Sequence, residues 1–217
     1  LHVVLTQNRK QVQWKYISDH ELKTNIRMFD HLIENQISQH NFFPKICGNK
    51  VCIRLLNRRD IKQYHQFMSN ANVAKYMSWY PIENIEASKA RMARIFLEYQ
   101  QEELFHLAIS LSTGTFIGII GLSKYDLTEK TCQIIYAIDE PYWRKGYTQE
   151  ALELFVEYLF SIKKKDTIIA THIKDNIASG KVMKKCGFIR TPSRDTTMII
   201  KGKEEELLAY TIERRLL

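Results

Sequence analysis

The order of the segments in the second half of the sequence constrains the fold more than any other feature. Three segments rich in β-branched and aromatic residues follow one another with short polar turns between them, at residues 104–111, 116–124 and 132–138. This pattern predicts three consecutive antiparallel strands. A helix, an apolar strand and a second helix come next, at residues 147–163, 167–173 and 177–185. Gly187 is suited to end the last helix as a left-handed C-cap.

Elements on both sides of this block complete the predicted domain. A strand at 52–56 and two helices at about 60–70 and 84–101 precede it, and strands at 196–200 and 207–212 follow it. The sequence therefore predicts a mixed α/β (α+β) fold, with a central, mostly antiparallel sheet of about seven strands flanked by helices.

Residues 1–48 are predicted to form an N-terminal extension of a main domain at 49–217. Alternation over 12–16 predicts a strand or hairpin, and a capping box at 18–21 predicts a helix after it. This helix carries an apolar stripe on one face, made of Leu22, Ile26, Phe29, Ile33 and Ile37. Because an exposed stripe of this length would promote aggregation, we expect it to dock on the main domain or on a partner subunit, as in a homodimer.

Composition and charge narrow the function classes. With 217 residues, 45% of them hydrophobic, the chain can bury one sizeable core. The longest apolar run, 116–122, is far shorter than the roughly 20 residues that span a bilayer, and no signal-peptide pattern is present, so we expect a cytoplasmic protein with no membrane partner. The net charge of +8 favours an anionic ligand or a polyanionic partner. No nucleic acid is expected, because the chain shows no readout motif.

The four cysteines do not indicate a site. Their spacing fits neither a zinc site nor a disulfide framework, so neither a metal nor a disulfide is expected.

The junction between the strand ending at Ile138 and the helix starting at Tyr147 has features of an anion site. Pro141 ends the strand, and Gly146 leaves room for a ligand close to the backbone. The amides of 144–149 would point out of the helix N-terminus without intrahelical partners, where a phosphate can bind. From these residues alone, a plain strand-to-helix connection with two solvated basic residues is an equal alternative.

A second junction follows the strand at 167–173. Asn176 and Ser179 lie at the start of the next helix. Taken alone, Asn176 is interpreted as an N-cap and Ser179 as a residue of the first turn.

Together the two junctions resemble a known family. Residues 142–151 read Tyr-Trp-Arg-Lys-Gly-Tyr-Thr-Gln-Glu-Ala, and residues 176–188 read Asn-x-x-Ser-x-x-Val-x-x-Lys-x-Gly-Phe. Both resemble the GNAT superfamily of acyl-CoA-dependent N-acetyltransferases, in the branch of the ribosomal-protein serine and alanine N-acetyltransferases. The resemblance covers roughly residues 50–217 and does not reach residues 1–45.

The resemblance implies a binding site for acetyl-CoA. The CoA pyrophosphate would bind to the backbone of the loop made of Trp143, Arg144, Lys145, Gly146, Tyr147 and Thr148. The strand ending at Ile138 would pair with the pantetheine arm, and Asn176 would contact CoA through its side chain. Because two early helices wall the acceptor pocket in such folds, Trp79 and Tyr80 are candidates for that pocket, with core packing as the equal alternative.

The resemblance also implies a reaction. Many members carry a tyrosine that protonates the departing thiolate, but Met183 stands at that position and cannot donate a proton. The resemblance suggests Ser179 as the proton donor in place of that tyrosine. We predict transfer of an acetyl group to a primary amine, of a protein N-terminus or a small molecule, by direct attack in a ternary complex. The alternative is a catalytically weak CoA-binding regulatory protein of the same fold, suggested by Met183 and by Thr148, where glycine or alanine is usual.

Overall fold

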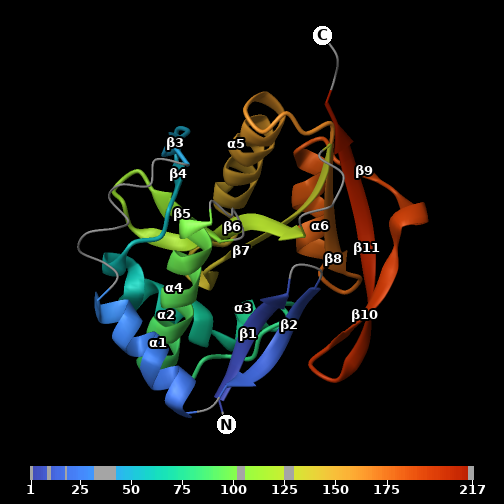
Figure 1. Cartoon of the computed structure of the whole chain (residues 1–217). Helices are drawn as coiled ribbons and strands as arrows, with labels where there is room; N and C mark the ends of the chain where they lie inside the picture. The colour runs from blue at the N-terminus through green and yellow to red at the C-terminus, as the bar shows by residue number, and fades with distance from the viewer. Residues whose placement is uncertain are drawn as a thin grey trace.

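One large sheet organises the molecule. The computed structural model describes residues 2–8, 11–17, 19–31, 43–101, 106–124 and 130–214 (Figure 1). Within them, nine strands form one sheet: β3 (Ile46–Cys47), β4 (Val51–Arg54), β5 (Leu107–Leu111), β6 (Phe116–Lys124), β7 (Thr131–Ile138), β8 (Thr167–Ile173), β9 (Ile189–Arg190), β10 (Thr196–Ile200) and β11 (Lys203–Glu213). The strand order is β10-β11-β8-β7-β6-β5-β4-β3, and β9 pairs with β11.

The predicted mostly antiparallel sheet is confirmed, and its predicted size of about seven strands is corrected to nine. The two additional strands, β3 and β9, have two residues each, too few to show a period in the sequence. Both are recognisable only by their pairing with β4 and β11.

The sheet opens between β7 and β8, which pair in parallel. Their register runs from Thr131 with Thr167 to Ile134 with Ala170. Beyond these positions β7 continues to Ile138, paired with β6, and β8 continues towards its own end, paired with β11. The carboxyl halves of β7 and β8 are therefore not paired with each other, and ligands of open α/β sheets bind at such carboxyl ends.

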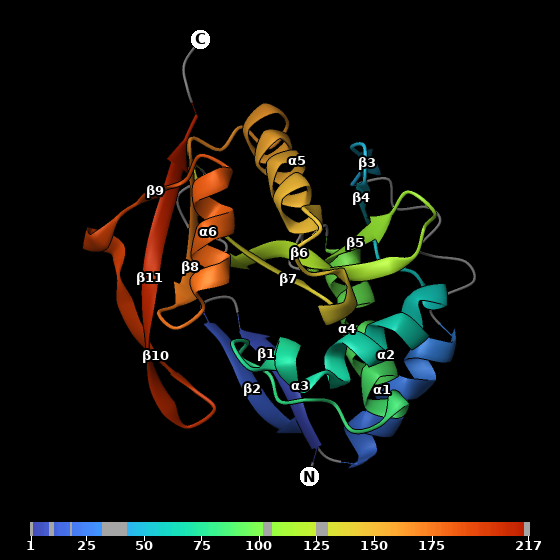
Figure 2. The ribbon, with the colours of Figure 1, turned by 180° about the vertical axis from the view of Figure 1, so that it is seen from behind.

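Helix α5 (Tyr147–Ser161) follows β7 after a short 3-10 helix at Glu140–Tyr142, and α6 (Ile177–Lys185) follows β8. The two helices lie side by side on one face of the sheet (Figure 2). A stripe of α5 is buried, made of Ala151, Leu152, Phe155, Val156, Tyr158 and Leu159. Gly187, just after α6, has φ +84°, as expected of a left-handed C-cap. The N-termini of both helices consequently lie next to the opening between the strands.

The earlier helices are α2 (Ile61–Ser69), α3 (Ala71–Ala74) and α4 (Ile85–Gln100). Asn84 caps α4, because its side chain accepts a hydrogen bond from the N–H of Ala87 at 2.9 Å. Helix α4 packs against α2, and α2 packs against β6.

The N-terminal segment forms a separate hairpin of β1 (His2–Asn8) and β2 (Gln11–Ile17), followed by α1 (Asp19–His31). Helix α1 packs along α4 (Figure 1). Ser18, Ile33 and Ile37, which the sequence assigned to the capping box and the stripe, lie outside the described residues. In the described parts of the chain, no helix is both long and apolar enough to span a bilayer.

A disulfide between Cys47 and Cys52 joins β3 to β4, contrary to the prediction from the sequence. The two cysteines are directly opposite in the register of the hairpin, with their Cα atoms 4.0 Å apart. A spacing of five residues becomes meaningful only once this register is known, which is why the cysteine pattern did not indicate it.

Candidate active site

The turn between β7 and α5 is built to present backbone N–H groups. The Asp139 side chain accepts the N–H of Glu140 at 2.9 Å and thereby starts a short 3-10 helix. Arg144 and Gly146 then adopt left-handed backbone conformations, with φ of 61° and 80°. Successive N–H groups in such a turn form an anion-binding concavity. Gly146 also provides no side-chain cap for α5, so the N–H groups of its first turn remain available to a ligand.

Trp143, predicted to bind the cofactor, also holds the turn in place. Its indole Nε1 donates to the carbonyl of Ile138 at 2.7 Å, and 41% of the side chain is exposed. This bond ties the turn to the end of β7. The neighbouring basic residues Arg144 and Lys145 are exposed, and Lys145 Nζ lies 5.6 Å from the centre of the Tyr142 ring.

Thr148, also predicted to bind the cofactor, is half-buried in the first turn of α5, as is Tyr147 before it. Both therefore lie beside the N–H groups that the turn presents.

Asn176 and Ser179 occupy the start of α6, as predicted. Asn176 is the N-cap, and its Oδ1 accepts the N–H of Ser179 at 3.3 Å. The Ser179 hydroxyl lies 2.9 Å from the hydroxyl of Tyr136, which also donates to the Ser179 carbonyl at 3.2 Å. A contact of Asn176 with CoA remains a prediction.

Tyr136 is a candidate functional residue that the sequence reasoning missed. It lies on β7, and its hydroxyl reaches α6 across the opening between β7 and β8. Burial raises the pKa of Tyr136 well above its usual value, while the hydrogen bond with Ser179 acts in the opposite direction. The phenol is therefore protonated at neutral pH and can act as a donor. The alternation along β7 was the available signal, since it places Tyr136 on the same face as the buried Cys132 and Ile134.

Met183, which stands at the usual tyrosine position, is a core residue with 1% of its side chain exposed. Its role is packing. A phenol is still present at the start of α6, supplied by a strand instead of the helix.

The first turn of α6 fits closely against a buried histidine. His172 stacks on Tyr210 with ring centres 5.5 Å apart, and its Nδ1 lies 2.8 Å from the carbonyl of Ile173. A Cβ atom on Gly180 would lie 2.6 Å from His172 Nε2, so glycine is required for this approach. The contact fixes the height of α6, and of Ser179 with it, above β8.

The two predicted residues of the acceptor pocket are in different environments. Trp79 is 2% exposed and packs on Phe67, with ring centres 6.0 Å apart, which favours the core alternative. Tyr80 is 54% exposed, and Lys201 Nζ, from the turn between β10 and β11, lies 5.6 Å from its ring centre. A role in acceptor binding stays a prediction that suits Tyr80 better than Trp79.

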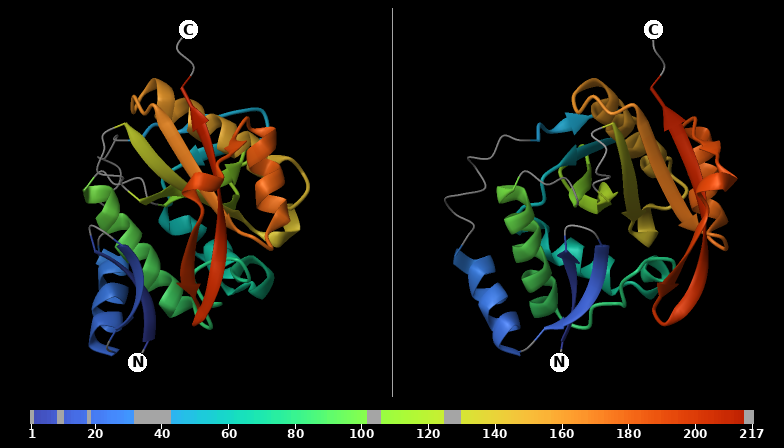
Figure 3. Two further views of the ribbon diagram at one scale, coloured as in Figure 1. Left: turned by 90° about the vertical axis from the view of Figure 1, so that its right-hand side faces the viewer. Right: turned by 45° about the vertical axis from the view of Figure 1, so that its right-hand side comes forward.

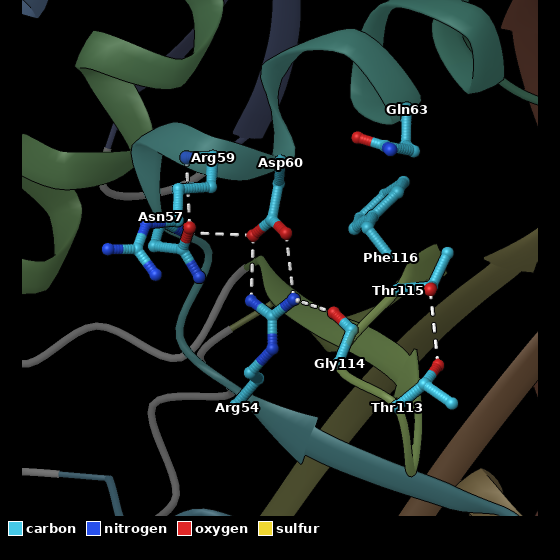
Figure 4. A pocket seen from close by; sticks show the side chains of 9 residues that line it. All are labelled: Arg54, Asn57, Arg59, Asp60, Gln63, Thr113, Gly114, Thr115 and Phe116. Carbon is cyan, nitrogen blue, oxygen red and sulfur yellow. Dashed lines mark hydrogen bonds and ion pairs between the residues drawn. The ribbon is translucent and has the colours of Figure 1, made fainter.

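A hollow of about 340 Å³ lies between the end of β4 and the turn between β5 and β6 (Figure 4). The guanidinium of Arg54 forms two hydrogen bonds of 2.7 Å with the carboxylate of Asp60 and one of 2.9 Å with the carbonyl of Gly114. Asp60 also accepts the N–H of Asn57 at 2.9 Å. Because these charged groups satisfy one another, the network stabilises the turn from β4 into α2.

No cluster of three or more metal-ligating side chains occurs within the ranges that the structure describes.

Comparison with known proteins identifies a family. The family described as "Acetyltransferase (GNAT) domain" matches residues 50–189. The chain is 26% identical over 171 residues to an uncharacterized N-acetyltransferase of Bacillus subtilis (strain 168), YoaA, and the match covers 78% of this chain and 97% of YoaA.

Two solved structures illustrate the shared fold. RimL, a ribosomal L7/L12 alpha-N-protein acetyltransferase in complex with CoA, has a TM-score of 0.68 at 16% identity, covering 78% of this chain and 98% of RimL. The spermidine N-acetyltransferase of Vibrio cholerae, in complex with CoA and spermine, has a TM-score of 0.63 at 16% identity, covering 75% of this chain and 95% of the other.

Proposed function

The chain belongs to the GNAT acetyltransferase family, and we propose that it transfers the acetyl group of acetyl-CoA to the primary amine of a single-amine acceptor. The observation that carries the proposal is the position of two groups at one opening of the sheet. The N–H groups of the turn at 144–149 lie at the end of β7, and the hydroxyl pair of Ser179 and Tyr136 spans from β7 to α6. The N–H groups of the turn suit a diphosphate, and the hydroxyl pair suits a thioester sulfur.

In the proposed complex, the diphosphate of CoA binds to the left-handed turn at Arg144 and Gly146 and to the first N–H groups of α5. The pantetheine arm lies along the edge of β7 that faces β8, beyond Ile134, where the two strands no longer pair. The structure of RimL, which shares the fold and contains bound CoA, supports a CoA site in a chain of this fold.

The residues at the start of α6 would assist the departure of the thiol. The acceptor nitrogen forms a bond to the acetyl carbon, the carbon–sulfur bond breaks, and the sulfur receives a proton from the Ser179 hydroxyl. Ser179 is then reprotonated by the Tyr136 phenol, whose hydroxyl lies 2.9 Å away. The resulting phenolate takes up, through water, the proton that the amine has lost. No cysteine intermediate takes part, because burial raises the pKa of Cys186 to about 12 and keeps it a thiol.

The electrostatics favour an acceptor with one amine of low pKa. Of the carboxylates next to the site, Glu140 binds the side chains of Asn70 and Asn72, and Asp139 caps the turn. An α-amine, with a pKa near 8, needs less help from a base than an alkylamine near 10. The net charge of +8 also disfavours a polycationic acceptor. The proposed acceptor class is therefore a peptide N-terminus or a small molecule with one such amine.

An amine panel tests the proposal. Release of free thiol from acetyl-CoA is measured with peptides that begin with serine, alanine or methionine, with spermidine, and without amine as the control. We expect turnover with one or more peptides above the control rate. Binding of acetyl-CoA without thiol release on any amine would favour the alternative, a CoA-binding regulatory protein.

A further inference from the structure

The β3–β4 hairpin lies beside α5, far from it in the sequence (Figure 3). The backbone N–H of Lys50 donates to Glu150 Oε1 at 2.8 Å, across 100 residues. Gly48 permits this approach, since a Cβ atom there would lie 2.1 Å from Glu150 Oε1. The hairpin is closed by the bond between Cys47 and Cys52. The backbone of Lys50 is therefore held against the first turn of α5.

The side chain of Lys50 reaches the turn that presents the N–H groups. Its ammonium nitrogen lies 3.4 Å from the position that a Cβ atom on Gly146 would occupy. Among the described residues, the ion pairs do not include this ammonium. The positive charge of Lys50 therefore adds to the partial positive charge of the α5 N-terminus next to Gly146.

We infer that Lys50 is a further binding residue of the acetyl-CoA site and contacts the diphosphate. The inference rests on the proposed function and extends it, because Lys50 lies outside both motifs that carry the family resemblance. Glu150 acts as a positioning residue, since its carboxylate holds the backbone of Lys50 and not the ligand. Because the closed hairpin holds the Lys50 backbone, binding restricts only the side chain, so this lysine strengthens binding more than one on a free loop would.

Dissociation constants for three ligands test this inference on the full chain. Lys50→Met should raise the Kd of acetyl-CoA by roughly 5- to 20-fold, as expected for loss of one charge-assisted contact to phosphate. It should raise the Kd of 3′-dephospho-CoA by the same factor. It should leave the Kd of S-acetylpantetheine, which has no phosphate, unchanged.

Lys163→Met is the matched control. It removes the same charge just beyond the other end of α5, about 25 Å from the turn, and should leave all three constants unchanged. Glu150→Ala tests the positioning role. It should weaken acetyl-CoA binding in the wild-type background but cause no additional loss in the Lys50→Met background, a coupling that simple destabilisation would not produce.

Each contrary result overturns a different statement. Wild-type affinity of a folded Lys50→Met protein for acetyl-CoA would overturn the role of Lys50 and leave the proposed function intact. A loss seen with acetyl-CoA but not with 3′-dephospho-CoA would overturn the diphosphate assignment, because the contact would then be with the 3′-phosphate. A wild-type chain that binds none of the three ligands would overturn the proposed function together with this inference.

Discussion

Replacing Ser179 with alanine separates a catalytic role of its hydroxyl from a structural one. The substitution removes the Oγ atom that lies 2.9 Å from the Tyr136 hydroxyl, but the phenol keeps the Ser179 carbonyl at 3.2 Å as an acceptor. The cap of α6 is also retained, because Asn176 binds the backbone N–H of residue 179. The folded state therefore loses one hydrogen bond, about 1 kcal/mol, which lowers the Tm of a chain of this size by about 2–4 °C.

The expected kinetic effect is larger than this structural effect. If the Ser179 hydroxyl protonates the leaving sulfur, Ser179→Ala should lower kcat by roughly 10- to 100-fold, at the low end of general-acid effects because water can substitute. The KM for acetyl-CoA should change little, since the interaction forms in the transition state. Steady-state thiol release and thermal unfolding are measured on the same preparation.

Tyr136→Phe provides the companion measurement. If the two hydroxyls form one relay, Tyr136→Phe should lower kcat by a similar factor, and the double variant should be no slower than the slower single variant. Wild-type kcat in Ser179→Ala, accompanied by the lower Tm, would refute the catalytic role. Independent, multiplying losses in the double variant would refute the relay while leaving Ser179 as a donor.

Three further perturbations have defined outcomes. Gly146→Val should abolish acetyl-CoA binding in a titration while the chain stays folded by circular dichroism, because φ +80° strains a β-branched residue and its side chain would enter the diphosphate turn; unchanged affinity would contradict the assigned site. Deleting residues 1–45 should lower the Tm or change the mass in solution, because α1 packs along α4; an unchanged Tm and mass would show an independent tail. Asp139→Asn should raise the Tm at pH 7, because burial raises the pKa of Asp139 and disfavours its charged form in the folded protein. The pKa of Asp139 is higher in the folded protein than in the unfolded chain, where it is near 3.9, so the free energy of unfolding of the wild type falls as the pH rises from the unfolded to the folded pKa. Below about pH 4 the side chain is protonated in both states, and the advantage of the asparagine variant should vanish.

Local patterns were sufficient to predict most of the fold. Strands β6, β8 and β10 and helix α6 have the predicted bounds, because turns or caps such as Gly187 mark their ends. The site turn was predictable for the same reason, since Pro141 and Gly146 each restrict the backbone where they stand. The left-handed conformation of Arg144 was not, because a non-glycine residue rarely adopts it and only the surrounding contacts select it.

The side chains that complete the site were not predictable, because they come from segments brought together by packing. Tyr136 meets Ser179 across 43 residues, and Lys50 reaches α5 across 100. The first contact depends on where β7 and β8 cease to pair, and the second on a hairpin whose first strand has two residues. Neither contact is marked in the sequence by hydrophobic periodicity or by a capping motif. A motif thus specifies the backbone that holds a ligand. A proton donor or a charged group can instead come from any element that packing places next to the ligand site. The loss of the motif tyrosine at Met183 is therefore a weak argument against catalysis in this chain, because β7 delivers a phenol to Ser179 at the start of α6, about one turn before Met183.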